Sequence, residues 1–285
     1  LGSALVADPR IKAVGFTGSL AGGRALYGLC ASRPEPIPFF GELGSVNPMF
    51  VLPQAAAARG ADLGAGWAAS LTMGAGQFCT NPGIAIVVDG KGADAFVQSA
   101  AEGLEGVAEQ TMLTDGIADA YRNGVRRVSE GAGVRSLLTT SCQGRNAAPY
   151  LFEVSASEWM INQDLSEEVF GPLGLVIRAR DAAQMREVAE SFKGQLTATL
   201  QMDDGDIELA RDLLPVMERM AGRVLANGFP TGVEVCDAMV HGGPYPASTN
   251  FGATSVGTLS IRRFLRPVCY QNLPEELLPD DLVNV

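Results

Sequence analysis

The chain has 285 residues, of which 47% are hydrophobic and 19% are charged, and its net charge at pH 7 is −11. This composition predicts a folded protein with a large core, whereas the negative charge and the lack of any Lys- or Arg-rich run argue against a nucleic-acid partner. No apolar stretch reaches the roughly 18 residues of a membrane span, so we expect no membrane partner either. The opening Leu1–Arg10 lacks the pattern of a signal peptide, and we expect the chain to begin inside a longer protein.

Cysteine usage favours a reducing compartment. The five cysteines are Cys30, Cys79, Cys142, Cys236 and Cys269, and the single histidine is His241. An odd number at irregular spacing is not a disulfide framework, and no group of Cys and His has the close spacing of a structural zinc site. We therefore expect a cytoplasmic protein without a metal.

Short apolar runs alternate along the chain with longer helical patterns. The predicted strands are Ala13–Phe16, Met49–Leu52, Ile84–Val88, Gly174–Ile177, Leu196–Gln201 and Arg223–Ala226. The predicted helices are Gly22–Ala31, Ala55–Thr72, Ala93–Gly103, Asp115–Glu130, Ala182–Phe192 and Ile207–Ala221. Strands separated by helices of this length form βαβ units, so we predict an α/β fold with a mostly parallel sheet.

Local signals mark helix starts and boundaries. Asp181 and Asp206 each precede a predicted helix, where a carboxylate caps free N–H groups. Pro- and Gly-rich stretches at Arg33–Pro38 and Gly242–Ser248 interrupt the pattern and indicate boundaries in the organisation of the chain. After the second stretch, Thr258–Phe264 is predicted to be a further strand.

The first two motifs surround predicted strands. In Val14–Ser19 a strand is followed by a glycine turn and a helix start, where free N–H groups bind phosphate; a plain strand–turn–helix explains it equally well. In Phe40–Pro48, Glu42 lies between apolar and glycine neighbours. Partial burial would raise the pKa of Glu42 and make it a general base, and the alternative is a carboxylate in a surface loop.

The third motif, Met73–Gly83, places Cys79 in a turn rich in Gly, Asn and Pro. Free backbone N–H groups there favour an oxyanion, so Cys79 is a candidate nucleophile rather than a buried structural cysteine. A papain-type protease would need its own histidine and asparagine partners, and His241 is the only histidine. No Cys–His pair is evident, so we expect a separate carboxylate to act as the base.

The fourth motif, Ser166–Pro172, contains Glu168 and Phe170 directly before a predicted strand. A carboxylate and a nearby aromatic ring suit a ribose and a flat heterocycle. An ordinary turn before a strand is the alternative.

In this order, Phe-Thr-Gly-Ser, Glu-Leu-Gly-x-x-Asn-Pro, Gly-Gln-x-Cys and Glu-x-Phe-Gly-Pro resemble the aldehyde dehydrogenase family, and the run Arg223–Asn227 fits it as well. The resemblance implies an aldehyde dehydrogenase-like fold, with a parallel-sheet catalytic domain and the end of a Rossmann-like cofactor domain. It divides the chain into the end of the NAD(P)-binding domain (1–42), the catalytic domain (43–241) and a C-terminal segment for oligomerisation (242–285). It also implies a homodimer or homotetramer.

The resemblance assigns the chemistry to two residues. Cys79 would attack the aldehyde to give a thiohemiacetal, which loses hydride to NAD or NADP and becomes a thioester. Glu42 would be the general base that activates water for hydrolysis, and the Cys79 backbone N–H would form part of the oxyanion hole. The reaction needs no metal, because the cofactor accepts the hydride.

The other roles follow from the same resemblance. The residues implied to bind the cofactor are Gly18 and Ser19 at the pyrophosphate, Leu43 and Gly44 beside the nicotinamide, Glu168 at its ribose and Phe170 next to its ring. Phe78 and His241 are expected at the substrate. The chain lacks the long N-terminal portion of family members, which leaves NAD versus NADP open.

Three stretches narrow the branch of the family. Glu42–Pro48, Gly76–Gly83 and Val240–Thr249 are similar to enzymes that oxidise α-ketoglutaric semialdehyde (2,5-dioxovalerate) to 2-oxoglutarate. The alternatives are an NADP-dependent fatty or broad aliphatic aldehyde dehydrogenase and a truncated, inactive fragment. A substrate carboxylate in an apolar tunnel needs a cationic or hydrogen-bond-donating partner. The expected candidates are His241, Arg262 and Arg263.

Overall fold

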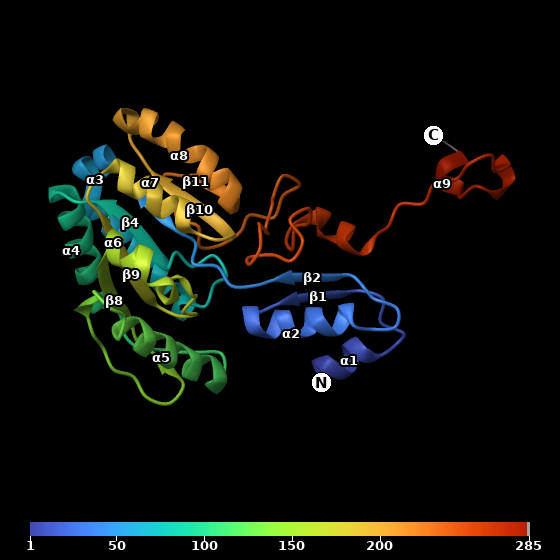
Figure 1. Ribbon diagram of the computed structural model, residues 1–285, viewed down its shortest axis with the longest axis horizontal. Coiled ribbons are helices and arrows are strands. Elements are labelled where there is room, and N and C mark those ends of the chain that lie inside the picture. Colours follow the sequence, from blue (N-terminus) through green and yellow to red (C-terminus); the bar gives the residue numbers. More distant parts are fainter. Residues whose placement is uncertain (284–285) are drawn as a thin grey trace.

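A seven-stranded sheet organises the computed structural model, which describes residues 1–283 (Figure 1). The strand order is β11-β10-β3-β4-β9-β8-β6, and only the pair β6 and β8 is antiparallel. The strands are β3 (Met49–Val51), β4 (Ile84–Val88), β6 (Arg135–Leu138), β8 (Tyr150–Ser155), β9 (Leu173–Ala179), β10 (Gln195–Gln201) and β11 (Ala221–Ala226). The predicted α/β fold with a mostly parallel sheet is confirmed.

Helices cover both faces of this sheet (Figure 1). One face carries α3 (Pro53–Thr72) and α4 (Lys91–Glu105), whose side chains form one core cluster with the strands. The other face carries α5 (Asp115–Ser129), α6 (Ala156–Ile161), α7 (Ala182–Ser191) and α8 (Ile207–Met220). Two-sided burial explains why β3 and β4 are continuous apolar runs.

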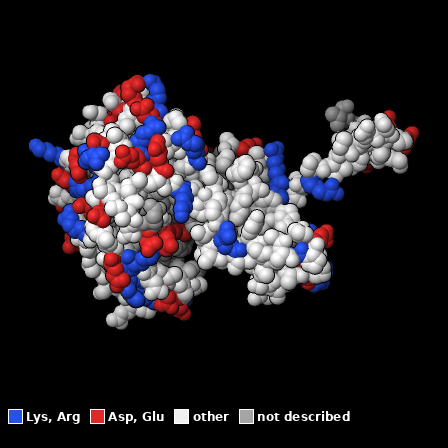
Figure 2. Space-filling model, viewed as in Figure 1, with Lys and Arg blue, Asp and Glu red and all other residues white. Residues whose placement is uncertain are grey.

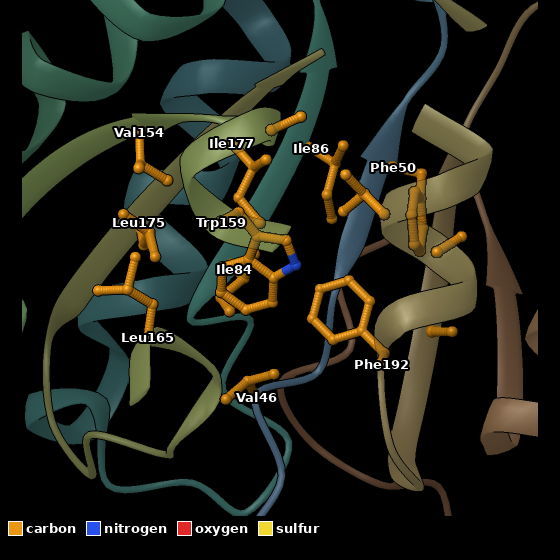
Figure 3. Close-up of a cluster of buried hydrophobic side chains, with 14 of the residues drawn as sticks. Val46, Phe50, Ile84, Ile86, Val154, Trp159, Leu165, Leu175, Ile177 and Phe192 are labelled. Carbon is orange, nitrogen blue, oxygen red and sulfur yellow. The ribbon is translucent and has the colours of Figure 1, made fainter. Parts of the chain in front are cut away.

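Alternation along β4 divides its side chains between the two cores. Ile84 and Ile86 belong to the cluster under α5–α8, whereas Ala85 and Val87 belong to the cluster under α3 and α4. Figure 3 shows the first cluster, in which side chains from β4 and β9 meet Trp159 of α6 and Phe192.

A second, smaller sheet precedes the large one in the sequence. β1 (Val14–Thr17) and β2 (Phe39–Glu42) pair in parallel, and α1 (Gly2–Ala7) and α2 (Leu20–Ala31) pack beside them. The segment 247–249 lies along β2, since Glu42 and Ser248 form an antiparallel bridge. β2 therefore ends where the two sheets and the C-terminal segment meet.

The remaining elements are short. They are η1 (Met73–Gly76), β5 (Gln110–Thr111), β7 (Asn146–Ala147), η2 (Gln163–Ser166), η3 (Asp204–Asp206), η4 (Thr258–Phe264), η5 (Glu275–Leu277) and α9 (Asp280–Val283). After η4 the chain extends away from the body (Figure 1). Lys and Arg are interspersed with Asp and Glu on the face in Figure 2. In the described part of the chain, no helix is long and apolar enough to cross a membrane.

Two local predictions are wrong. Thr258–Phe264 is the 3-10 helix η4 and not a strand; its residues are exposed or half-buried, and no described strand pairs with it. Asp206 does not cap the helix that follows it. Its carboxylate accepts hydrogen bonds from the backbone N–H groups of Gln54 (2.9 Å) and Ala55 (3.0 Å), so it caps α3 instead. The predicted cap at Asp181 is confirmed, because its carboxylate accepts from the Gln184 N–H at 2.8 Å.

Candidate active site

The turn that carries Cys79 begins with left-handed backbone. Gly74, Ala75 and Gly76 have φ values of 58°, 58° and 66°, which reverse the chain after α3. Gly76 is also pressed against the fourth motif: a Cβ added there would lie 2.3 Å from the carbonyl carbon of Gly171. Only glycine satisfies both conditions, and Cys79 follows half-buried in the next turn, as predicted.

Two asparagine side chains hold this turn in place. The Nδ2 atom of Asn47 donates to the carbonyl oxygens of Cys79 and Asn81, each at 2.9 Å. The Nδ2 atom of Asn81 donates to the carbonyls of Gly76 (3.0 Å) and Gly171 (3.1 Å). The backbone N–H of Cys79 donates to no residue that the structure describes, so it is available to an oxygen bound beside the sulfur.

Three predicted residues meet at the sulfur. The Cys79 Sγ atom lies 3.3 Å from Nε2 of His241, and the same nitrogen lies 3.2 Å from Oε1 of Glu42. The His241 and Glu42 side chains are 2% and 6% exposed. Ser255 Oγ donates a hydrogen bond to the other Glu42 oxygen. The three groups also lie close enough for one cation to reach them, but their mutual hydrogen bonds account for the closeness.

Charge pairing dominates the electrostatics of this centre. Burial works against the charged form of His241, but hydrogen bonds and charge from Cys79 and Glu42 outweigh it and raise the pKa of His241 to about 9. Burial works against the charged form of Glu42 as well, but His241, Ser255 and Cys79 lower its pKa overall. The expectation of a raised pKa for Glu42 is therefore wrong in its net direction, because the effect of His241, together with those of Ser255 and Cys79, outweighs that of burial.

His241 also corrects a second expectation. A Cys–His pair is present, although none is evident in the sequence. The backbone N–H of His241 donates to Thr254 Oγ1 at 2.8 Å, and the His241 carbonyl accepts from the Ser255 N–H at 2.8 Å. These bonds turn the imidazole inward. A lone histidine in a Gly- and Pro-rich turn was the only signal in the sequence.

Three of the predicted cofactor residues line one cavity of about 480 Å³: Ser19, Gly44 and Glu168. Burial raises the pKa of Glu168 to about 7, although the Ser45 backbone N–H bonds to it. A Cβ at Gly44 would lie 3.0 Å from a Glu168 carboxylate oxygen. Ser19 accepts a hydrogen bond from the Gly22 N–H at 3.2 Å and caps α2.

The other predicted residues lie around this cavity without lining it. The Gly18 N–H donates to the Glu42 carbonyl at 3.1 Å, which aligns the ends of β1 and β2. Leu43 is buried. Phe78 and Phe170 line a neighbouring cavity that also contains Glu168. Only three residues of the predicted cofactor set therefore face one cavity, and Phe170 faces a neighbouring one.

Arginines approach the site from two segments. Arg263 lines a small cavity together with Glu42 and His241, whereas Arg262 lines only an outer cavity of about 420 Å³ that Arg263 shares. Arg223 of β11 also interacts electrostatically with Cys79. The sequence marks Arg223 only as part of the strand run Arg223–Asn227, and no motif around Ser255 marks that residue.

Comparison with known proteins places this geometry in context. The family model described as "Aldehyde dehydrogenase family" matches residues 1–245. The chain is 52% identical to alpha-ketoglutaric semialdehyde dehydrogenase 2 of Azospirillum brasilense over 99% of this chain and 54% of that protein. It is 46% identical to the alpha-ketoglutaric semialdehyde dehydrogenase of Acinetobacter baylyi, again over 99% and 54%. The chain therefore spans about half the length of these relatives.

Solved structures share the fold. A gamma-glutamyl-gamma-aminobutyraldehyde dehydrogenase from Burkholderia cenocepacia superposes with a TM-score of 0.76 at 18% identity, over 92% of this chain and 52% of that one. A 1-pyrroline-5-carboxylate dehydrogenase from Thermus with bound NAD has a TM-score of 0.71 at 22% identity, over 93% and 51%. Since the family model covers most of the sequence, the chain belongs to the aldehyde dehydrogenase family.

Proposed function

We propose that this chain carries the catalytic centre for oxidation of an aldehyde to a carboxylic acid with NAD or NADP. The observation that carries the proposal is the convergence of the Cys79 sulfur, the His241 Nε2 atom and the Glu42 carboxylate. A thiol beside a proton acceptor is the arrangement that generates a nucleophile. Cys79 is then the residue to which the substrate becomes attached.

Acylation begins with removal of the thiol proton of Cys79. Nε2 of His241 is within hydrogen-bond distance of Sγ, and the Glu42 carboxylate stabilises the imidazolium that results. The sulfur then forms a bond to the aldehyde carbon, and the carbonyl π electrons move to oxygen. The free backbone N–H of Cys79 stabilises that oxyanion, so the product of this step is a thiohemiacetal.

The cavity that Ser19, Gly44 and Glu168 line suits a nicotinamide cofactor. Ser19 opens the 12-residue helix α2, whose N-terminal N–H groups suit a pyrophosphate, and the Glu168 carboxylate suits a ribose hydroxyl. Gly44 leaves the space beside Glu168 open. When bound, such a cofactor supplies one chemistry, acceptance of a hydride from the carbon attached to Cys79, which leaves a thioester.

Hydrolysis returns the enzyme to its starting state. Glu42, freed from the thiol, takes a proton from a water molecule, whose oxygen bonds to the thioester carbon. The C–S bond then breaks, and the Cys79 sulfur leaves as a thiolate within hydrogen-bond distance of the His241 imidazolium, which returns its proton to the sulfur. The carboxylic acid is released, and Glu42 gives its proton to solvent.

For the substrate we propose 2,5-dioxovalerate, with 2-oxoglutarate as the product. The names of the two relatives at 52% and 46% identity support this assignment.

Formation of NADH or NADPH with 2,5-dioxovalerate tests the function. Cys79→Ser is expected to lower kcat/KM by at least about 1000-fold, because the nucleophile is lost. Cys269→Ser is the matched control, since Cys269 is an exposed free cysteine, and its kcat/KM is expected to stay unchanged. Persistent turnover in Cys79→Ser would sink the proposal. A wild-type preference for long aliphatic aldehydes would instead assign the chain to the fatty-aldehyde group.

A further inference from the structure

Arg223 approaches the catalytic centre from the edge of the large sheet. Its neighbour Gly222 packs tightly against the segment that follows His241, because a Cβ at Gly222 would lie 2.4 Å from the Gly242 carbonyl oxygen. Strand β11 is thus fixed next to the turn that delivers the imidazole. The electrostatic interaction between Arg223 and Cys79 agrees with this placement.

The guanidinium of Arg223 has unused hydrogen-bonding capacity. It donates to the Gly232 carbonyl at 3.1 Å and to the Pro230 carbonyl at 2.6 Å, which leaves three of its five N–H groups. Its Nε atom is buried and has no partner among the described residues. Burial of this cation lowers the pKa of Arg223, an effect that Cys79 only partly opposes.

Arg223 also lacks a carboxylate partner among the described residues, in contrast to Arg178 and Arg59. Arg178 pairs with Glu153 at 2.6 Å, and Arg59 pairs with Asp203 at 3.0 Å. A half-buried cation with only carbonyl partners carries an uncompensated charge. Beside a nucleophile, that charge favours an anion supplied by a ligand.

We propose that Arg223 binds the anionic end of the substrate whose aldehyde group reacts at Cys79. The substrate class is a short aldehyde that carries a carboxylate, and this inference rests on the proposed function. Arg223 is then a specificity-determining residue that contacts the end of the substrate remote from the reacting carbon.

The C-terminal arginines are less well placed for this role. Arg263 donates its Nε–H to the Ser260 carbonyl at 3.1 Å and lies over the ring of Phe264, with 5.3 Å to the ring centre. Arg262 is exposed. Among the described arginines, Arg223 combines a buried unpartnered N–H with an electrostatic interaction with Cys79.

The experiment measures protection of Cys79 without cofactor or turnover. Iodoacetamide alkylates the thiol, a reversible thiohemiacetal blocks it, and peptide mass spectrometry follows Cys79 alone. The probes are 5-oxopentanoate and its uncharged methyl ester, which differ in the charge at the remote end. For the wild type we expect half-protection at an about 10-fold lower concentration of the carboxylate, as a charge-assisted hydrogen bond predicts.

Variants assign that preference to a residue. Arg223→Gln is expected to reduce the preference to about twofold or less, and Arg223→Lys to leave an intermediate preference, because lysine keeps the charge but loses the planar fork. Arg211→Gln is the control, since Arg211 is an exposed residue of α8 paired with Glu208, and it should match the wild type. If Arg223→Gln does not fold, the intermediate value for Arg223→Lys carries the test.

Several results would overturn the inference. They are equal protection by both probes in the wild type, a full preference in Arg223→Gln or Arg223→Lys, and loss of the preference in Arg263→Gln instead. A fall in iodoacetamide reactivity with an unchanged preference would also overturn it, because Arg223 would then act on the thiolate. Failure of the proposed function gives a different result. In that case no NADH or NADPH forms, but the two probes still differ in the concentration that half-protects Cys79.

Discussion

A single imidazole nitrogen, Nε2 of His241, contacts both the Cys79 sulfur and a Glu42 oxygen. One proton on that nitrogen can therefore be shared with only one partner at a time. In a Ser-His-Asp triad the acid instead bonds to the second ring nitrogen. This geometry couples the charge of the thiol to that of the carboxylate, and it predicts that removal of His241 changes both groups.

The pH dependence of stability tests this pairing. His241 has its pKa raised from 6.5 to about 9, so its contribution is full below pH 6.5 and is lost as the pH rises through about 9. Glu42 has its pKa lowered from 4.5, so its contribution is full above pH 4.5 and is lost as the pH falls further. The pair therefore stabilises the fold most between pH 4.5 and 6.5.

We expect His241→Phe to destabilise the protein by about 3 kcal/mol in that window, because Glu42 is left buried without its partner. The loss should shrink above pH 9. Thermal unfolding of both proteins from pH 5 to pH 10 measures it, and the double variant with Glu42→Gln is the control, whose own stability should vary less with pH than that of the wild type. A constant difference across the range would contradict the pairing.

At the scale of the element, the turn of residues 74–76 positions Cys79, the proposed nucleophile. Gly76→Ala places a Cβ at φ 66° and within 2.3 Å of Gly171 backbone, so we expect a loss of at least about 2 kcal/mol. The matched control is Gly28→Ala in the exposed part of α2, where nothing lies within 4 Å, and a gain of about 0.5 kcal/mol is expected. Denaturant unfolding measures both. Equal effects would show that the turn is not constrained.

The sequence predicted the elements that are apolar and bounded by turn residues. β4, for example, is recovered with its observed ends, Ile84–Val88. It missed β8, where Glu153 interrupts the apolar run; that carboxylate is tolerated because Arg178 and Arg135 pair with it. Such a partner comes from another strand, and no local pattern reveals it.

The candidate site also combines features that local sequence predicts with contacts that it does not. The motifs around Glu42 and Cys79 are local and mark both residues. The contact between Cys79 and His241 joins positions 162 residues apart, and the fold alone brings them together. The pKa of Glu42 depends on its own contact with the same histidine, which explains why the pKa was predicted in the wrong direction.

At the scale of the whole molecule, the three proposed catalytic groups come from separate parts of the chain. Glu42 ends a strand of the small sheet, Cys79 follows α3 on the large sheet, and His241 belongs to the segment that returns along β2. The proposed reaction therefore requires that the two sheets be held in one arrangement. Formation of a covalent acyl-enzyme therefore tests whether the fold brings these three groups together.

Trapping this intermediate is the most direct test of the account. Glu42→Gln is mixed with 2,5-dioxovalerate and NAD or NADP, quenched in acid and digested, and the cysteine peptides are weighed by mass spectrometry. We expect a burst of NADH or NADPH and a 2-oxoglutaryl group on the Cys79 peptide alone, because the base that activates water is missing. Product formation with Cys79 unmodified, or an acyl group on any of the other four cysteines, would contradict the assignment of Cys79 as the nucleophile.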